Sequence, residues 1–127
     1  MTITLLYGGL LGLLFLILTV LVIARRFKYR VSIGEGNCPE LQTAIRAHGN
    51  FAEYVPLCLV LLGGCELAGV APLWLHISGA LLVVGRILHA IGIQIPKAPN
   101  PYRMFGILST FAVLLMLSLL ALSHALA

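Results

Sequence analysis

Four long apolar stretches constrain this chain more than any single motif. The first runs from Ile3 to Ala24 without a charged side chain. Because a helix needs about 20 apolar residues to cross a bilayer, the length of the chain allows four spans and little else. We therefore predict an all-α integral membrane protein, a four-transmembrane-helix bundle forming a single domain over residues 1–127. The helices are expected near residues 3–25, 40–68, 73–94 and 102–124.

Composition excludes an ordinary soluble domain. Hydrophobic residues make up 61% of the chain and charged residues only 9%, whereas charged residues form about a quarter of a typical soluble domain. The net charge is +4, but the chain has no soluble basic domain with a motif that recognises nucleic acid. A nucleic-acid partner is therefore not expected.

The basic residues predict the orientation in the membrane. One group follows the first span and comprises Arg25, Arg26, Lys28 and Arg30; a second lies in the loop before the fourth span. The turn at residues 69–72 is uncharged. Since basic loops stay in the cytoplasm, both termini are expected outside. The first span is not expected to be a cleaved signal, because no positive charge precedes it and no small-residue cleavage site follows.

A polar stripe interrupts the second span. Arg46, Asn50, Glu53 and Leu57 recur at spacings of four, three and four, so they share one helical face, with Tyr54 beside it. An ionised residue at bilayer depth costs about 2.5–3.5 kcal/mol on insertion scales, so this face must meet protein or a watery cavity. Two interpretations follow: a structural polar network between helices, or a polar ligand site.

The third span carries a second polar face on its inner half. Arg86 and His89 lie one turn apart there, and the rise of the helix places Arg46 and Arg86 about 10–15 Å from the inner ends of their helices. Glu53 is the only carboxylate near that depth, so we expect it to pair with Arg86 or Arg46. The remaining positive charge favours a small, multiply anionic ligand.

These residues resemble a known family, the membrane-associated proteins in eicosanoid and glutathione metabolism (MAPEG). The resemblance covers four spans in register and is closest to bacterial-type members similar to microsomal glutathione transferase. It is carried by the second-span motif Arg46-Ala47-His48-x-Asn50-x-x-Glu53-Tyr54-x-Pro56, by Arg25-Arg26, by Gly85-Arg86-Ile87-Leu88-His89-x-x-Gly92 and by Arg103.

The resemblance implies a homotrimer in a bacterial inner membrane, in contact with membrane lipids. It implies glutathione as co-substrate, held between subunits on the cytoplasmic side. A lipophilic electrophile or lipid hydroperoxide would be the second substrate of a transferase or peroxidase. By position, Arg103 would support the glutathione thiolate. The glutathione-binding residues would be Arg26, Arg46, His48, Asn50, Glu53, Tyr54, Arg86 and His89; for His48, a structural role is the alternative.

The sequence leaves other functions open. Catalytic eicosanoid members place tyrosines on the third span where this chain has His89 and Ile93, so a non-catalytic, lipid-binding scaffold of the same fold is an alternative to the enzyme. A small four-span exporter is disfavoured, because residues 3–24 hold no coupling carboxylate. The three cysteines lack metal-site spacing, so no metal is expected.

Overall fold

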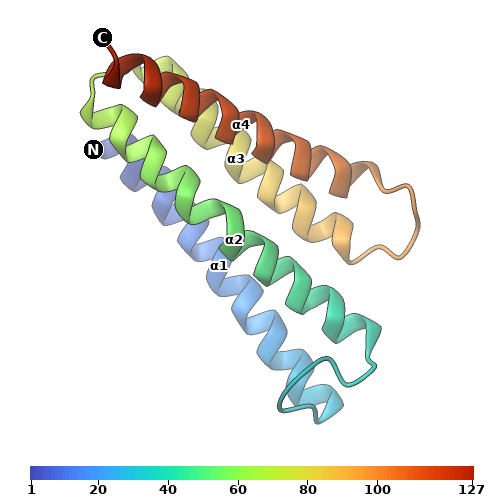
Figure 1. The fold of residues 1–127 in the computed structure, drawn as a ribbon. Coiled ribbons are helices and arrows are strands. Elements are labelled where there is room, and N and C mark those ends of the chain that lie inside the picture. Colours follow the sequence, from blue (N-terminus) through green and yellow to red (C-terminus); the bar gives the residue numbers. More distant parts are fainter.

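The computed structural model describes residues 1–127 as four α-helices joined by loops (Figure 1). The helices are α1 (Thr2–Tyr29), α2 (Pro39–Leu67), α3 (Pro72–Ile93) and α4 (Pro101–Ala125). Proline stands in the first turn of α2, α3 and α4, where its missing N–H group would have had no helical partner. The predicted all-α, four-helix class is confirmed.

The helix α1 ends at Tyr29, four residues beyond the predicted end at residue 25. Its last turn is closed by Arg30, which adopts the left-handed conformation with φ 55 and ψ 39. The amides of Arg30 and Val31 bond back to the carbonyls of Phe27 and Arg26, which satisfies groups that a helix end leaves free. The basic residues 25–28 therefore belong to the helix itself, where they also complement its dipole.

The bundle consists of two helical hairpins, α1–α2 and α3–α4. Both termini and the short α2–α3 turn lie at one end, where the hairpins are close together; toward the other end, which holds the two longer loops, the hairpins diverge (Figure 1). The helix α2 contacts all three other helices, whereas α1 and α4 lie apart. A pocket opens between α2 and the ends of α3 and α4 that meet the α3–α4 loop.

The outward surface of the bundle is apolar. All four helices are long and apolar enough to cross a membrane. Large apolar side chains face outward on every helix, for example Leu13, Val60, Val84 and Leu115. Because a soluble protein rarely exposes so extensive an apolar surface, the chain is an integral membrane protein.

Small residues allow α3 and α4 to pack closely. A Cβ atom added at Gly106 would lie 2.6 Å from both the carbonyl oxygen of Gly85 and the amide nitrogen of His89. One turn further along α3, a Cβ at Gly92 would collide with the backbone of Arg103. Close approach through small residues is how membrane helices gain packing energy without a hydrophobic driving force. The inner ends of α3 and α4 are consequently in direct backbone contact.

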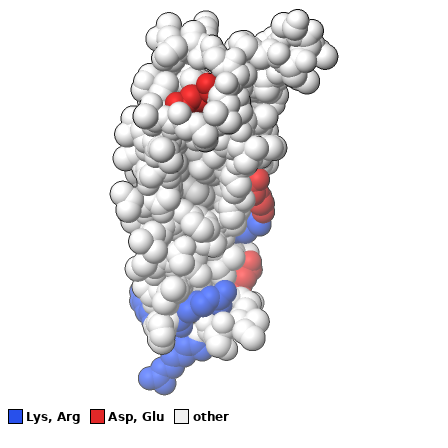
Figure 2. Space-filling view, turned by 90° about the vertical axis from the view of Figure 1, so that its left-hand side faces the viewer, with Lys and Arg blue, Asp and Glu red and all other residues white.

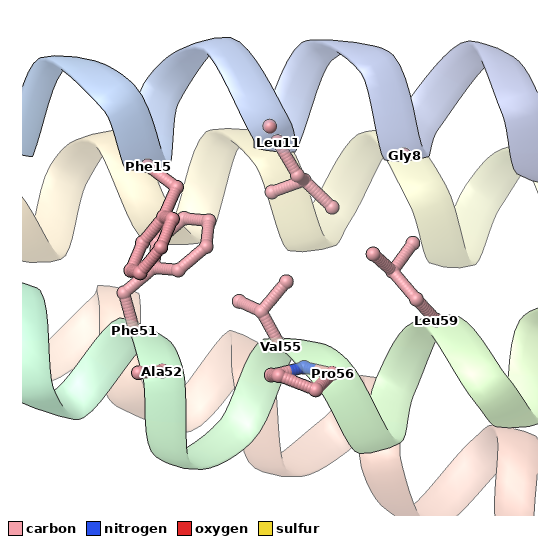
Figure 3. Close-up of a pocket in the computed structure, with 9 residues that line it drawn as sticks. Gly8, Leu11, Phe15, Phe51, Ala52, Val55, Pro56 and Leu59 are labelled. Atoms are coloured by element: carbon pink, nitrogen blue, oxygen red, sulfur yellow. The ribbon is translucent and has the colours of Figure 1, made fainter.

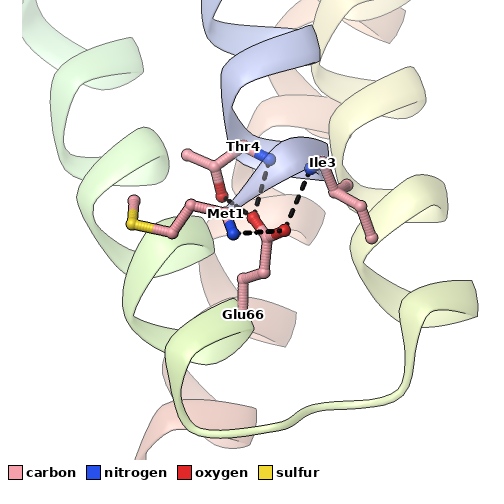
Figure 4. Close-up of polar contacts among 4 residues, drawn as sticks. All are labelled: Met1, Ile3, Thr4 and Glu66. Atoms are coloured by element: carbon pink, nitrogen blue, oxygen red, sulfur yellow. Dashed lines mark hydrogen bonds and ion pairs between the residues drawn. The ribbon is translucent and has the colours of Figure 1, made fainter.

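A carboxylate joins α1 to α2 at the end opposite the diverging hairpins. Glu66 accepts hydrogen bonds from the amides of Ile3 (2.9 Å) and Thr4 (2.8 Å), and it pairs with the Met1 amino group at 3.4 Å (Figure 4). Amides at a helix start have no helical acceptor, so Glu66 caps α1 from a neighbouring helix. This contact holds the start of α1 against the end of α2.

We predict that Gly106→Ala destabilises the protein through overpacking, by about 1–3 kcal/mol. The reason is that the atoms in the way belong mainly to backbone, which cannot turn aside. Gly9→Ala is the matched control, because no atom lies within 4 Å of its added Cβ. Thermal unfolding in mild detergent should show a lower melting temperature for Gly106→Ala alone; equal melting temperatures would contradict the close α3–α4 packing.

Candidate functional site

A polar pocket lies between α2, α3 and α4 at the end where the hairpins diverge. Its volume is about 450 Å³, within the range of about 300–1,000 Å³ typical of small-molecule sites. Four residues singled out from the sequence line it: Arg46, Asn50, His89 and Arg103. The other lining residues are Gln42, Thr43, Ile93, Ile95 and Pro96. Two arginines and no carboxylate face this space, so its chemistry suits an anion.

Arg86 lies beneath this pocket and is almost entirely buried, with 2% of its surface exposed. It donates from one terminal nitrogen to Oδ1 of Asn50 at 2.6 Å and from the other to the carbonyl oxygen of Gly106 at 3.0 Å. Its Nε has no hydrogen-bond partner within the protein. Arg86 therefore connects α2, α3 and α4, and it orients the Asn50 side chain that lines the pocket.

The position of Arg103 is set by the start of α4. Asn100 caps that helix by accepting a hydrogen bond from the Arg103 amide at 3.2 Å, while its own amide group donates to the carbonyl oxygen of Gly92 at 2.7 Å. Since Gly92 has no side chain, the Arg103 backbone rests directly on α3. The Arg103 side chain is exposed and borders the pocket without a hydrogen bond to the protein.

The polar stripe of α2 divides between two surroundings. Asn50 faces α3 and Tyr54 packs on Phe111 of α4, with ring centroids 5.6 Å apart. Glu53 is exposed at the edge of the same face, and Arg46 is exposed where it borders the pocket. The stripe therefore marks the boundary between the interior of the helix bundle and its outer surface.

The expected ion pair of Glu53 with Arg86 or Arg46 is absent from this chain. Glu53 makes no salt bridge; the sole salt bridge in the chain joins Glu66 to the N-terminus. The physical reason is that Arg86 lies on the α3 side of α2 and is satisfied by an amide and a carbonyl oxygen, while Glu53 points outward. The prediction was wrong within one chain, and Glu53 and Arg46 remain unpaired in it.

His48 lies outside the pocket, on the side of α2 that faces α1. Its Nε2 is 3.2 Å from the hydroxyl of Thr19, and its ring stacks on Phe15 with centroids 4.6 Å apart. Two residues along a helix correspond to a rotation of about 200°, so the spacing from Arg46 alone places His48 on the opposite side. This geometry matches the structural role given above as its alternative.

Arg26 also lies away from the pocket, at the inner end of α1. One of its terminal nitrogens is near the carbonyl oxygens of Val31 (3.3 Å), Ser32 (3.3 Å) and Gly34 (3.0 Å). Within one chain, Arg26 thus holds the α1–α2 loop against its own helix.

An apolar cavity of about 250 Å³ lies between α1 and α2 (Figure 3). Leu11 and Phe15 of α1 face Phe51, Val55 and Leu59 of α2 across it (Figure 3). It contains no charged side chain, so it offers no group to bind a carboxylate. The two cavities thus separate polar from apolar recognition on either side of α2.

Four polar contributors to the pocket were missed from the sequence: Gln42 and Thr43, which line it, and Gln94 and Asn100, which support it. Thr43 donates to Oε1 of Gln94 at 3.1 Å, which joins the start of α2 to the end of α3, and Gln94 Nε2 is buried without a partner. Asn100 positions Arg103, as described above. The signal for Asn100 was available, since asparagine before Pro101 is a favoured N-cap with proline following at N1.

Positive charge is concentrated at the pocket end of the molecule. Figure 2 shows Lys and Arg gathered at the lower end, below a body that is largely uncharged. The lower end in this view is the end of α1, which carries Arg25, Arg26, Lys28 and Arg30; Arg103 borders the polar pocket from the start of α4.

Comparison with known proteins agrees with this architecture. A family model described as the MAPEG family matches residues 4–123. The chain is also 37% identical over 114 residues to the inner membrane protein YecN of Escherichia coli strain K12, across 90% of this chain and 86% of YecN. YecN of Escherichia coli O6:H1 strain CFT073 matches to the same extent. With the family match extending over nearly its whole length, this chain belongs to the MAPEG family.

Proposed function

We propose that this protein binds glutathione in the polar pocket and transfers it to lipophilic electrophiles or uses it to reduce lipid hydroperoxides. The observation that carries the proposal is the unbalanced charge of the pocket: Arg46 and Arg103 border it, and no carboxylate does. Glutathione carries two carboxylates, one ammonium group and a thiol, so a carboxylate and the thiolate could each pair with one of these guanidinium groups. Membership of a family named for glutathione and eicosanoid metabolism supports the same reading.

The pocket also offers neutral hydrogen-bonding groups suited to a peptide. Gln42 and Thr43, near the start of α2, and Asn50, about two turns further along, face the same space. Arg86 fixes the Asn50 amide through the 2.6 Å bond, so that group is oriented before a ligand arrives. We infer that Arg46 holds a glutathione carboxylate, with Asn50 contacting its peptide backbone.

Arg103 is the residue that we assign to the sulfur. The thiolate is the reactive nucleophile, and a neighbouring cation lowers a thiol pKa from about 8.5 toward neutrality. The Arg103 guanidinium is free of protein hydrogen bonds and is exposed at the start of α4, a helix long and apolar enough to cross a membrane. A second substrate dissolved in the bilayer could therefore meet sulfur beside it.

One observation favours the alternative, a non-catalytic lipid-binding scaffold. Ile93 lines the pocket at a position where catalytic eicosanoid members carry a hydroxyl group, and an isoleucine cannot donate a hydrogen bond. His89 is the remaining ring donor on α3 that faces the pocket. Enzyme and scaffold thus differ in whether bound glutathione becomes a thiolate.

We further propose that the working unit is a homotrimer and that its subunits satisfy the exposed polar face of α2. Glu53 stands about 21 Å from the start of α2, near the middle of the membrane. An ion facing lipid there costs about 2.5–3.5 kcal/mol or more. A cation on a neighbouring subunit would remove this cost by pairing with Glu53. Glu53 and Arg46 would then contribute to glutathione binding from the boundary between subunits. Arg26, His48 and Tyr54 would contribute only if assembly brings a ligand to them.

The kinetic roles of the two arginines can be separated. We expect Arg103→Ala to lower kcat about 100-fold, the effect of removing a donor to a developing anion, and to abolish thiolate absorbance of bound glutathione near neutral pH. Arg46→Ala should instead raise the Kd for glutathione, because it removes an anchor used equally throughout the reaction. Conjugation of a chlorodinitrobenzene-type electrophile, with and without glutathione, measures kcat, and titration of the protein with glutathione, followed by thiolate absorbance or calorimetry, measures the Kd.

The matched control for these variants is Lys97→Ala, which removes a charge from the neighbouring loop without touching the pocket. It should leave both parameters near those of the parent. Intact thiolate absorbance and turnover in Arg103→Ala would reject the catalytic assignment, and absence of a thiolate in the parent protein would favour the scaffold.

Assembly provides a second test. Glu53→Ala should break an ion pair between subunits and cost the trimer about 3–5 kcal/mol, the usual effect of removing one partner of a buried pair. Glu40→Ala is the control, since that carboxylate is exposed at the start of α2. Native mass spectrometry in mild detergent should show trimers for the parent and Glu40→Ala, and smaller species for Glu53→Ala. A stable monomer that retains glutathione would refute the proposal.

The topology predicts that the polar pocket faces the cytoplasm and that both termini lie outside. Single cysteines at Lys97 and Ala127, both exposed, can be placed in a Cys38→Ser background. An impermeant maleimide added to intact cells with permeable outer membranes should label the cysteine at 127, and should label that at 97 only after lysis. The reverse pattern would invert the orientation of the site.

A further inference from the structure

The inner end of α1 carries a separate cavity of about 370 Å³. It lies between the last turns of that helix and the loop that follows, and none of its residues borders the polar pocket. The residues that line it are Ile23, Arg26, Phe27, Arg30, Val31 and Ser32.

The lining combines an apolar wall with a cationic rim. Ile23 and Phe27 form the wall, and Phe27 is 81% exposed. Ile33, in the adjoining loop, is 89% exposed. Arg30 supplies a guanidinium that makes no hydrogen bond to the protein, and no carboxylate lines the cavity. An anion carrying an apolar chain would meet both surfaces.

The cavity is preformed by contacts within the chain. Arg26 holds the loop against α1 through the carbonyl oxygens of residues 31, 32 and 34. Arg30 sits in the left-handed conformation, which glycine or asparagine adopts more readily than other residues. A long cationic side chain thus occupies a position where a smaller residue would be less strained. We take this as a reason to ask what the charge of Arg30 binds.

The location of this cavity selects a lipid over a soluble ligand. It lies where a membrane-spanning helix ends in a basic segment, and exposed Phe27 and Ile33 there have no protein partner. Basic residues at that level lie beside the anionic headgroups of the cytoplasmic leaflet, while apolar side chains reach toward the acyl region.

We propose that this cavity binds one anionic phospholipid. The Arg30 guanidinium engages the headgroup phosphate, and the first part of an acyl chain lies along Phe27 and Ile23. Lys28 points to another side of the helix from Arg26, which lines the cavity, because two helical residues correspond to about 200° of rotation; its ammonium lies 5.0 Å from the centre of the Tyr29 ring. The site is therefore specific to one side of α1.

The test is titration of the detergent-purified full chain with phosphatidylglycerol, followed by native mass spectrometry of the retained lipid. Arg30→Asn, which suits the left-handed conformation, should weaken retention tenfold or more. Lys28→Gln removes an equal charge two residues away and should weaken it by no more than about fivefold, the general effect of one surface cation. Phe27→Ala should also weaken retention, whereas Phe105→Ala, an exposed phenylalanine on α4, should not.

Two further ligands separate the possible sources of binding. Phosphatidylcholine should be retained less than phosphatidylglycerol, and inorganic phosphate at the same concentration should not displace the lipid. Equal retention of phosphatidylcholine, equal effects of Arg30→Asn and Lys28→Gln, or displacement by inorganic phosphate would each overturn the proposal. Unchanged melting temperatures of the variants establish that any loss of lipid is not a loss of fold.

Discussion

A buried guanidinium with no carboxylate partner holds three of the four helices in place. Arg86 projects from α3 to Asn50 on α2 and to the Gly106 carbonyl oxygen on α4. Hydrogen bonds to a charged group contribute about 1.5–3 kcal/mol each, and leaving such a group unsatisfied at this depth is costly. Near the polar pocket, α2, α3 and α4 are consequently restricted to relative positions in which both the Asn50 side chain and the Gly106 carbonyl oxygen reach Arg86.

That arrangement depends on the absence of side chains where α3 and α4 meet. Gly106 offers its carbonyl oxygen to Arg86 because no Cβ separates the two helices there. At Gly92 the same closeness brings the backbone of Arg103 onto α3, and Asn100 secures it. The candidate catalytic arginine and the buried structural arginine are therefore placed by one helix contact, which links packing to chemistry.

The outer face of α2 connects the single subunit to its proposed assembly. One side of this helix is satisfied by Arg86 and Phe111, while Glu53 faces outward and Arg46 borders the pocket, both without ion-pair partners. Charged groups in a membrane normally pair with an opposite charge or line a watery cavity. A single chain in the membrane would therefore leave Glu53 without a partner. At the inner end of α1, by contrast, basic and aromatic groups face the bilayer interface, and there the lipid itself can serve as the partner.

Most of the architecture followed from the sequence, and so did part of the site. The length of the apolar stretches alone determined four membrane helices. In lipid, the N–H and C=O groups of each segment must form hydrogen bonds within that segment, which a helix achieves. Helical spacing likewise placed Arg46 and Asn50 on one face, and Arg86 and His89 on another. The start of α4 at Pro101 was predictable within one residue from its proline-rich approach.

Tertiary structure alone decided which of those polar residues meet. Periodicity describes directions around one helix but not the rotation of that helix toward its neighbours, so the choice of Asn50 over Glu53 as the partner of Arg86 was not readable from spacing. The same rotation turned His48 toward α1. The sequence by itself determined the helices and the presence of buried charge; the packing of α3 on α4 through glycine decided where that charge lies and which side chains border the pocket.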